Sequence, residues 1–375
     1  MPIYCRWLTV LVLLSGAHGS WVGATEPSPW LQVVRHTPYV YSANWFRNLT
    51  NIRTWVLTES GYCSDTDRHL LFDIRANFLA YQADSLFRMN TQAALNATRK
   101  RLAQEGKVHT WVPGTADELG YPFALACHQP HVDLPSALAR LLAWHEDFKV
   151  WGSWNGLQVG SARQPVALID MAKVVFDKQS RLQQLPYPEQ LWPLFVGQIV
   201  IESGAVKYTR SSAQALGMMQ LMPDVLDDCD ISDPYRQHRM AQLECATKLY
   251  GQNHRSLHKV FMQRFGHLPV AKQQQLYLLL LVQAYHGGVG RIASLLQPSS
   301  GSQEAQLTQA AEYFAQHHQR FSAEDIALGL IYHNMGRKQL AMASLYYLVD
   351  VGIVARKAMF ASGPVPVSTP KGRTN

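Results

Sequence analysis

The sequence has few charged residues and no long apolar segment. Charged residues make up 16% of its 375 residues, and hydrophobic residues make up 47%. A disordered chain has the opposite composition, so this chain is expected to fold around a core. Its apolar run from Leu8 to Leu14 is too short to cross a bilayer comfortably. No fixed period runs through the chain, which excludes collagen, coiled coils and repeat arrays.

Patterns that bind metals or nucleic acids are also lacking. The cysteines form no Cys-x-x-Cys pair and have no histidine at zinc-site spacing. The acidic cluster from Asp224 to Asp233 lacks the glycine and the terminal glutamate of a calcium loop, and helix caps and turns explain it better. The basic residues accompany no nucleic-acid-binding motif. We therefore expect no metal, no cofactor and no nucleic acid partner.

Positive charge is in excess and is concentrated in one stretch. The chain has 34 Lys and Arg against 27 Asp and Glu, a net charge of +7. Residues 236 to 291 hold eight basic residues and a single acid, Glu244, so this stretch accounts for the whole excess. An anionic partner such as a cell-wall polymer would suit this surface. A solvated helical face would give the same pattern, and both interpretations stay open.

The first residues are typical of an export signal. Arg6 precedes the short apolar run, and small residues follow it from Ser15 to Ser20. This pattern predicts a signal peptide over residues 1–24, with cleavage at Gly19/Ser20 or Ala24/Thr25. A buried N-terminal helix is the alternative. Cys5 comes before the apolar run, so a lipid anchor is not expected. We expect a periplasmic or secreted bacterial protein with no transmembrane segment in the mature chain.

Outside the signal, four cysteines remain: Cys63, Cys127, Cys229 and Cys245. An even number of cysteines in an exported chain favours disulfides, and four cysteines allow three connectivities. Because partners within one domain are closest together, we expect the pairs Cys63–Cys127 and Cys229–Cys245.

The chain divides near residue 180. Residues 25–180 mix patterns and predict an α/β N-terminal domain of unknown function. Val33 to Val40 and Asn51 to Thr58 are rich in β-formers and look extended, whereas Leu70 to Leu102 has helical spacing. Gly152 to Gln164 has the glycine and serine content of a loop.

Residues 181–357 predict a helical domain, so the fold class expected for the whole chain is mainly α. Apolar residues recur at helical spacing after Pro188, at Leu191, Phe195, Ile199 and Val200. Further helices are predicted at Arg239–Tyr250, Ala271–Tyr285, Gln306–Gln316 and Ala323–Val351. Residues 358–375 have little apolar content towards their end and predict a disordered tail.

Three motifs in the helical domain carry the chemistry. The first is Glu202-Ser203, at the end of an apolar helix, which alone would indicate nothing more than a turn. Fifteen residues after Glu202 comes the second, Gly217 to Pro223, which reads Gly-Met-Met-Gln-Leu-Met-Pro. The third, from Gln283 to Ile292, reads Gln-Ala-Tyr-His-Gly-Gly-Val-Gly-Arg-Ile.

Together these motifs resemble the goose-lysozyme-like soluble lytic transglycosylases, which cleave the glycan strands of peptidoglycan. The family pattern is Glu-Ser, a later Ser, Gly-Leu-Met-Gln-Leu-Met-Pro, and Ala-Tyr-Asn-Ala-Gly. This chain matches at Glu202-Ser203, Ser211, Gly217 to Pro223, Ala284, Tyr285 and Gly288, with Met218 for Leu. It departs at His286, Gly287 and Gln214, which stand for Asn, Ala and Gly. The resemblance covers about residues 185 to 295.

The resemblance implies a lysozyme-like helical catalytic domain that acts on peptidoglycan glycan strands. It implies that Glu202 acts first as general acid and then as base on the MurNAc–GlcNAc β-1,4 bond. The substrate's N-acetyl group assists and its 6-hydroxyl attacks, which gives 1,6-anhydro-MurNAc ends. The residues fit a mechanism that uses one carboxylate, because Glu202 is the only acid between Gln198 and Gln220. An ordinary glycosidase needs two carboxylates. Glu59 repeats the Glu-Ser-Gly string without the second motif, so we interpret it as structural.

The other site residues have weaker assignments. Ser211, Gln220, Met219 and Tyr285 are candidate substrate contacts, and Ser211 or Gln220 could orient Glu202 instead. Met219 also fits a cleft wall or core position, and Tyr285 also fits a packed core position. Supporting candidates are Ser203, Gly217 and His286, of which His286 fits a surface or packed position better than a titrating one.

Two other functions stay open. One is a muramidase of the same fold that uses water. The other is a catalytically weak peptidoglycan-binding component of a secretion or conjugation apparatus, which the departures at His286 and Gly287 allow.

Overall fold

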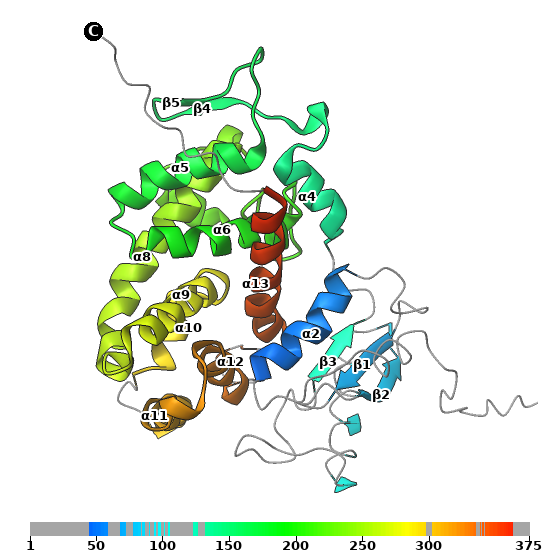
Figure 1. The fold of residues 1–375 in the computed structure, drawn as a ribbon, viewed down its shortest axis with the longest axis vertical. Coiled ribbons are helices and arrows are strands. Elements are labelled where there is room, and N and C mark those ends of the chain that lie inside the picture. Colours follow the sequence, from blue (N-terminus) through cyan, green and yellow to red (C-terminus); the bar gives the residue numbers. More distant parts are fainter. Residues whose placement is uncertain are drawn as a thin grey trace, which may run out of the picture.

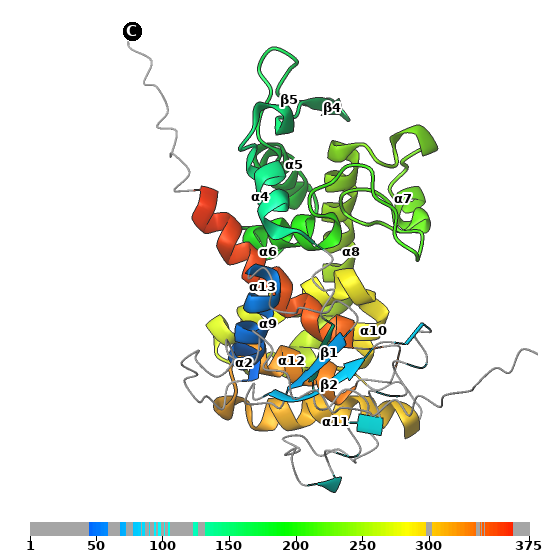
Figure 2. The ribbon, with the colours of Figure 1, turned by 90° about the vertical axis from the view of Figure 1, so that its right-hand side faces the viewer.

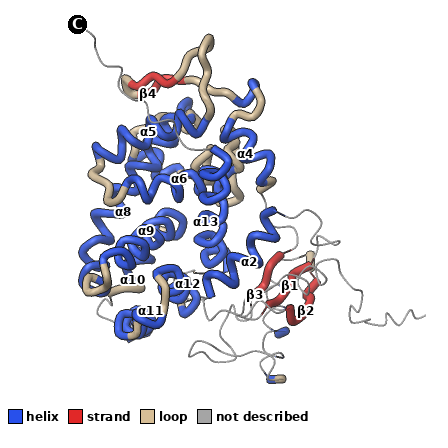
Figure 3. Tube along the Cα trace, viewed as in Figure 1, coloured by secondary structure: helices blue, strands red, loops and turns tan. Residues whose placement is uncertain are grey.

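The computed structural model describes residues 45–58, 68–72, 78–83, 123–126, 132–297, 302–334 and 342–362, and isolated positions from 85 to 105 and at 338 and 340. This part of the chain is mainly helical, as predicted (Figure 3). The helices are α2 (Trp45–Thr58), α4 (Leu134–Leu142), α5 (Leu168–Leu182), α6 (Pro188–Ser203), α7 (Pro223–Asp228), α8 (Arg239–Phe265), α9 (Val270–Gly287), α10 (Val289–Ser294), α11 (Ser302–Gln316), α12 (Ala323–His333) and α13 (Met342–Ser362). Single 3₁₀ turns lie at Glu146–Phe148, Asp233–Tyr235 and His318–Arg320.

Five short strands form two small antiparallel sheets. Strand β1 (Arg68–Phe72) lies between β2 (Phe78–Ala83) and β3 (Phe123–Ala126). Strands β4 (Gly152–Trp154) and β5 (Leu157–Val159) form a separate hairpin. The three-stranded sheet lies beside α2, and the hairpin lies at the opposite end of the molecule, above α5 (Figure 1). Both sheets therefore flank the helical core.

Helix α6 is the centre of that core. It is apolar on all sides, and its predicted apolar residues Leu191, Phe195, Ile199 and Val200 are fully buried. Its most extensive partner is α13, which it crosses at Gly197, where any side chain would collide with the Val351 carbonyl. Figure 2 shows α13 crossing α6 with α9 and α12 below. A helix enclosed in this way holds its last turn, which carries Glu202, in a fixed position.

Helix α5 crosses the domain boundary expected at residue 180. Its buried face includes Phe176, whose ring centroid lies 5.3 Å from that of Trp192 and 5.0 Å from that of Phe195, both on α6. Residues of α4, α5 and α6 belong to one continuous hydrophobic core. The described residues from 132 to 180 thus pack as part of the helical body.

Helix α2 docks on the far end of the same body. Arg53 forms a buried salt bridge with Asp350 of α13, with 2.5 Å between Nη2 and Oδ2. The backbone N–H of Phe46 donates to Asp325 Oδ1 of α12 at 2.9 Å. These two contacts fix the N-terminal end and the middle of α2 against the C-terminal helices.

Several local predictions from the sequence are wrong. Asn51–Thr58 is helical, because Leu49, Arg53 and Leu57 recur every four residues and form the buried stripe of α2. The first part of Leu70–Leu102 forms β1 and β2, because strand pairing with the distant β3 overrides the local spacing. The described positions from 90 to 101 are helical, as predicted. Gly152–Gln164 contains the β4–β5 hairpin, whose turn uses the positive φ of Asn155 and Gly156.

The helices predicted after residue 181 are present with changed limits. Helix α8 continues to Phe265, beyond the predicted end at Tyr250. The single helix predicted over Ala323–Val351 is two helices, and α12 ends where the buried Asn334 amide donates to the carbonyls of Leu307 and Leu330. Residues 358–362, expected in the tail, belong to α13. None of the helices in the described ranges is long and apolar enough to span a membrane.

One predicted disulfide is confirmed. Cys229 and Cys245 are bonded, with an S–S distance of 2.04 Å and a Cα–Cα distance of 5.6 Å. The bond ties the end of α7 to the first turns of α8. Cys63 and Cys127 lie outside the described residues, as do the signal segment, Val33–Val40 and Glu59.

Candidate active site

The last turn of α6 presents Glu202. The helix is capped by Gly204, whose φ of +64° is the left-handed conformation that favours glycine. The N–H groups of Gly204 and Ala205 return to the carbonyls of Val200 and Ile199, at 2.7 and 3.2 Å. This closing pattern ends the helix at Ser203, one residue after Glu202, and fixes the backbone that carries Glu202.

A chain of buried polar side chains leads to the Glu202 carboxyl. The Tyr347 hydroxyl of α13 donates to Glu202 Oε1 at 2.5 Å. Gln198, one turn before Glu202, donates from Nε2 to the Tyr347 oxygen at 2.7 Å. Its own Oε1 accepts from the Tyr250 hydroxyl of α8. Helices α6, α8 and α13 thus meet at one carboxyl.

The surroundings of Glu202 favour its neutral form. Desolvation raises the pKa of Glu202 from its usual 4.5 to about 7, while the Tyr347 hydrogen bond acts in the opposite direction. Glu202 is partly accessible, so one side of the residue still meets solvent. Burial, and secondarily the Glu202 charge, raise the pKa values of Tyr250, Tyr285 and Tyr347, which therefore stay protonated. Glu202 can both deliver and accept a proton near neutral pH.

Gly217 begins the loop of the second motif, and its conformation requires glycine. Its φ is +70°, and a Cβ would lie 2.5 Å from the Gln242 amide nitrogen. Gln242 is fully buried in α8, accepts from the Met219 N–H at 2.8 Å and donates to the Leu216 carbonyl at 3.0 Å. The predicted supporting role of Gly217 has this physical basis: it lets the buried amide hold the loop.

The three motifs meet at this loop. Ser203 Oγ donates to the Met218 carbonyl at 2.8 Å, and the Tyr285 hydroxyl donates to the Met219 carbonyl at 2.7 Å. The Tyr285 ring also stacks on Tyr250 at 5.5 Å between centroids. Tyr285 stands at the end of α9, which terminates at Gly287 with Gly288 as its cap. Glu202, the Gly217–Pro223 loop and Tyr285 are therefore held as one unit.

Two predicted residues make their hydrogen bonds within their own loops. Ser211 Oγ accepts from the Ala215 N–H at 3.0 Å, and Gln220 Nε2 donates to the Gly217 carbonyl at 2.8 Å. Neither is bonded to Glu202. Both are partly accessible, whereas Met219 is fully buried and belongs to the core.

His286 lies on the surface above this site. Its ring stacks on Tyr347 with 4.0 Å between centroids and 16° between planes. Desolvation, and then the charge of Arg291, lower the pKa of His286. The residue as a whole is exposed. The lowered pKa keeps the ring neutral at neutral pH.

The sequence did not predict three residues of the hydrogen-bond chain at Glu202: Tyr347, Tyr250 and Gln198. Gln198 was detectable in principle, because it precedes Glu202 by one helical turn. Tyr347 is 145 residues from Glu202, in a helix apolar on all sides, and no local pattern marks it.

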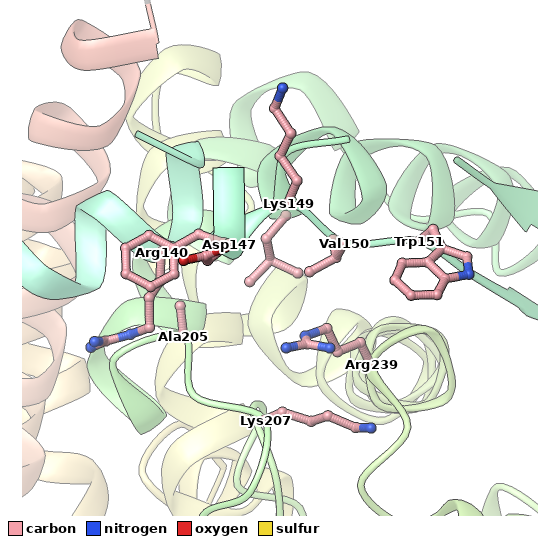
Figure 4. A pocket seen from close by; sticks show the side chains of 10 residues that line it. Arg140, Asp147, Lys149, Val150, Trp151, Ala205, Lys207 and Arg239 are labelled. Carbon is pink, nitrogen blue, oxygen red and sulfur yellow. The ribbon is translucent and has the colours of Figure 1, made fainter. Parts of the chain in front are cut away.

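Two cavities lie near the segment that follows Glu202. The first, of about 420 Å³, is lined by Ala205, Lys207 and Arg239 among others (Figure 4). The second, of about 580 Å³, shares Lys207 and continues along Tyr208 to His238. Glu202 lines neither of them. Within the described ranges, no group of three His, Cys, Asp or Glu side chains could hold a metal ion.

None of the protein-family models searched matches this chain, and no curated protein matches it either.

Proposed function

We propose that the chain is a peptidoglycan lytic transglycosylase with a lysozyme-like catalytic domain. It cleaves the MurNAc–GlcNAc β-1,4 bond and leaves 1,6-anhydro-MurNAc ends, with Glu202 as general acid and then base. The observation that carries the proposal is the position of the Glu202 carboxyl at the meeting point of the three motifs, where desolvation raises its pKa to about 7.

Bond cleavage starts with protonation of the leaving glycosidic oxygen. A carboxyl with an ordinary pKa of 4.5 is ionised at neutral pH, whereas the raised pKa of Glu202 keeps its acid form populated there. After it gives up its proton, the Tyr347 hydrogen bond stabilises the carboxylate. The carboxylate then takes the proton of the attacking hydroxyl. Both steps use the same two oxygens.

The immediate surroundings of Glu202 favour an intramolecular nucleophile. In the described part of the chain, the side chain that bonds to Glu202 and those whose pKa its charge raises are tyrosines, and no second carboxylate is among them. An enzyme that hydrolyses glycosides by the usual route needs such a group to hold water or to attack the sugar. A sugar hydroxyl held in place can have an effective molarity of about 10⁵ M or more. The muramyl 6-hydroxyl is the nucleophile that fits.

The proposal also includes the cellular setting. The signal pattern over residues 1–24 fits delivery to the periplasm or the exterior, where peptidoglycan is found. A partner that fits this activity is a secretion or conjugation apparatus, because such an assembly must open the wall locally.

Release of soluble muropeptides tests the proposal. Purified protein incubated with peptidoglycan sacculi is expected to release them, and the yield should fall as the pH rises through about 7, because the acid form of Glu202 is then lost. Co-sedimentation measured in the same samples reports binding. Binding to sacculi with no release at any pH would identify a wall-binding component and overturn the proposal.

Replacing Tyr347 by phenylalanine tests how the acid is held. The variant loses the hydrogen bond that stabilises ionised Glu202, so its pKa rises and the alkaline limb of the pH–activity profile moves to higher pH. We expect kcat to fall roughly 10- to 100-fold, since one hydrogen bond to a charged group is worth about 1.5–3 kcal/mol. Tyr313→Phe, at an exposed position in α11, is the control and should leave the profile unchanged. An unshifted alkaline limb in Tyr347→Phe would contradict this role.

A further inference from the structure

The first of the two cavities has the features of an anion site. It lies between the segment 147–151, the N-terminus of α8, and the chain that leaves α6 after Glu202. Figure 4 shows Arg239 and Lys207 on the wall opposite Val150 and Trp151. The lining residues are Arg140, Asp147, Phe148, Lys149, Val150, Trp151, Leu168, Ala205, Lys207 and Arg239. Four of them are basic and one is acidic.

Two of the four basic residues are committed to other partners. Arg140 Nε donates to the Gly204 carbonyl at 2.8 Å. Lys149 pairs with Glu146 at 2.7 Å, and its ammonium points away from the cavity (Figure 4). The single acid, Asp147, is exposed. These three residues form the wall and rim rather than the charged centre.

Arg239 and Lys207 form that centre. In the described part of the chain, Arg239 has no carboxylate partner, and its buried Nε makes no hydrogen bond. Lys207 donates to the Tyr208 hydroxyl at 2.7 Å and also has no acidic partner there. A buried guanidinium nitrogen without an acceptor is costly, and an anionic ligand would supply the acceptor.

Neighbouring residues show the effect of this positive charge. The charges of Lys207 and Arg239 add to desolvation in lowering the pKa of His238. They also add to the Lys207 hydrogen bond in lowering the pKa of Tyr208. Helix α8 begins at Arg239 with no acidic residue in its first turn, so its dipole adds to the positive potential. Trp151, 57% exposed, offers a flat apolar wall.

We propose that this cavity is a binding site for an oxyanion, a carboxylate or phosphate group, which Arg239 and Lys207 hold while the rest of the ligand lies against Trp151. The planar guanidinium can donate two hydrogen bonds to either group. The site is separate from Glu202, and the proposal does not depend on the proposed function.

Calorimetric titration of the Glu202→Gln protein tests this site without cleavage of any ligand. The probes are inorganic phosphate, muramyl dipeptide, and muramyl dipeptide with its carboxylate amidated. We expect Arg239→Gln to weaken binding of the charged probes by roughly tenfold or more, which matches the loss of a hydrogen bond to a charged group. Lys207→Gln should weaken this binding several-fold, and it replaces Arg239→Gln in the test if that variant does not fold. Lys259→Gln, an exposed lysine on the same helix, removes the same charge and should bind as the parent does.

The probes separate the sources of the anion. Tighter binding of muramyl dipeptide than of phosphate, abolished by amidation, would mean that the anion is carried by a wall fragment. Tighter binding of phosphate would mean a free anion, and either result supports an oxyanion site. Absence of binding by both charged probes would overturn the proposal. Equal affinities of Arg239→Gln, Lys207→Gln and Lys259→Gln would do the same.

Discussion

Replacing Glu202 by glutamine is expected to reduce the release of muropeptides from sacculi by roughly 10²–10⁴-fold, the usual contribution of general acid–base catalysis. Glutamine keeps the size of the side chain, and its oxygen can still accept the Tyr347 hydrogen bond. It cannot deliver a proton to the glycosidic oxygen. Glu189→Gln, at an exposed position in the first turn of α6, makes the same chemical change on the same helix and should leave release unchanged. Glu59→Gln should also leave the release of muropeptides unchanged.

The stability of Glu202→Gln shows whether a loss of activity reflects chemistry. The pKa of Glu202 is raised on folding, so the neutral side chain stabilises the fold below about pH 4.5, and this contribution is lost as the pH rises through about 7. At alkaline pH the ionised carboxyl costs up to about 3 kcal/mol, and the glutamine variant avoids this cost. Glu202→Gln should therefore melt at a higher temperature than the parent at alkaline pH and at a similar one in acid. Melting well below the parent at every pH would mean that the residue is structural.

Replacing Asp350 by asparagine is expected to lower the free energy of unfolding by about 3–5 kcal/mol, because it removes the carboxylate that pairs with the buried Arg53 guanidinium. Arg53 and Asp350 are exposed by only 2% and 6%. They join α2 to α13, which also carries Tyr347. Denaturant unfolding monitored by circular dichroism measures the loss.

A matched surface pair and a double variant complete this experiment. Glu105→Gln breaks the exposed pair with Arg101 and should cost less than about 1 kcal/mol. Replacing both buried partners, Arg53→Met with Asp350→Leu, should cost less than Asp350→Asn alone, because both charges of the buried pair are then removed. A double variant less stable than Asp350→Asn would show that the ion pair itself is stabilising.

The fold was predictable where apolar spacing and helix length agreed. Helices α6, α8, α9 and α11 follow from the sequence because their buried residues recur at helical spacing over several turns. The N-terminal elements were not predictable. The β-branched and aromatic residues of α2 predicted an extended segment, but its burial against α13 makes it helical. Strands β1 and β2 depend on pairing between distant segments, which local patterns do not record.

The candidate site was predictable in its motifs but not in its supporting contacts. Glu202, Gly217 and Tyr285 stood out because residue type and order matched the family pattern. Their connections run through carbonyl groups, as in the bonds of Ser203 and Tyr285 to Met218 and Met219, and main-chain acceptors have no sequence signature. Tyr347 reaches Glu202 only because α13 crosses α6 at Gly197.

The chemical nature of the glycan ends tests the lytic transglycosylase proposal most directly. Muropeptides released in oxygen-18-labelled water should carry 1,6-anhydro ends, be one water lighter than lysozyme products, resist borohydride reduction and contain no label. Mass spectrometry before and after reduction measures all of these properties in one digest. Reducible ends that carry oxygen-18 would show that water is the nucleophile, and would replace the transglycosylase proposal with that of a muramidase.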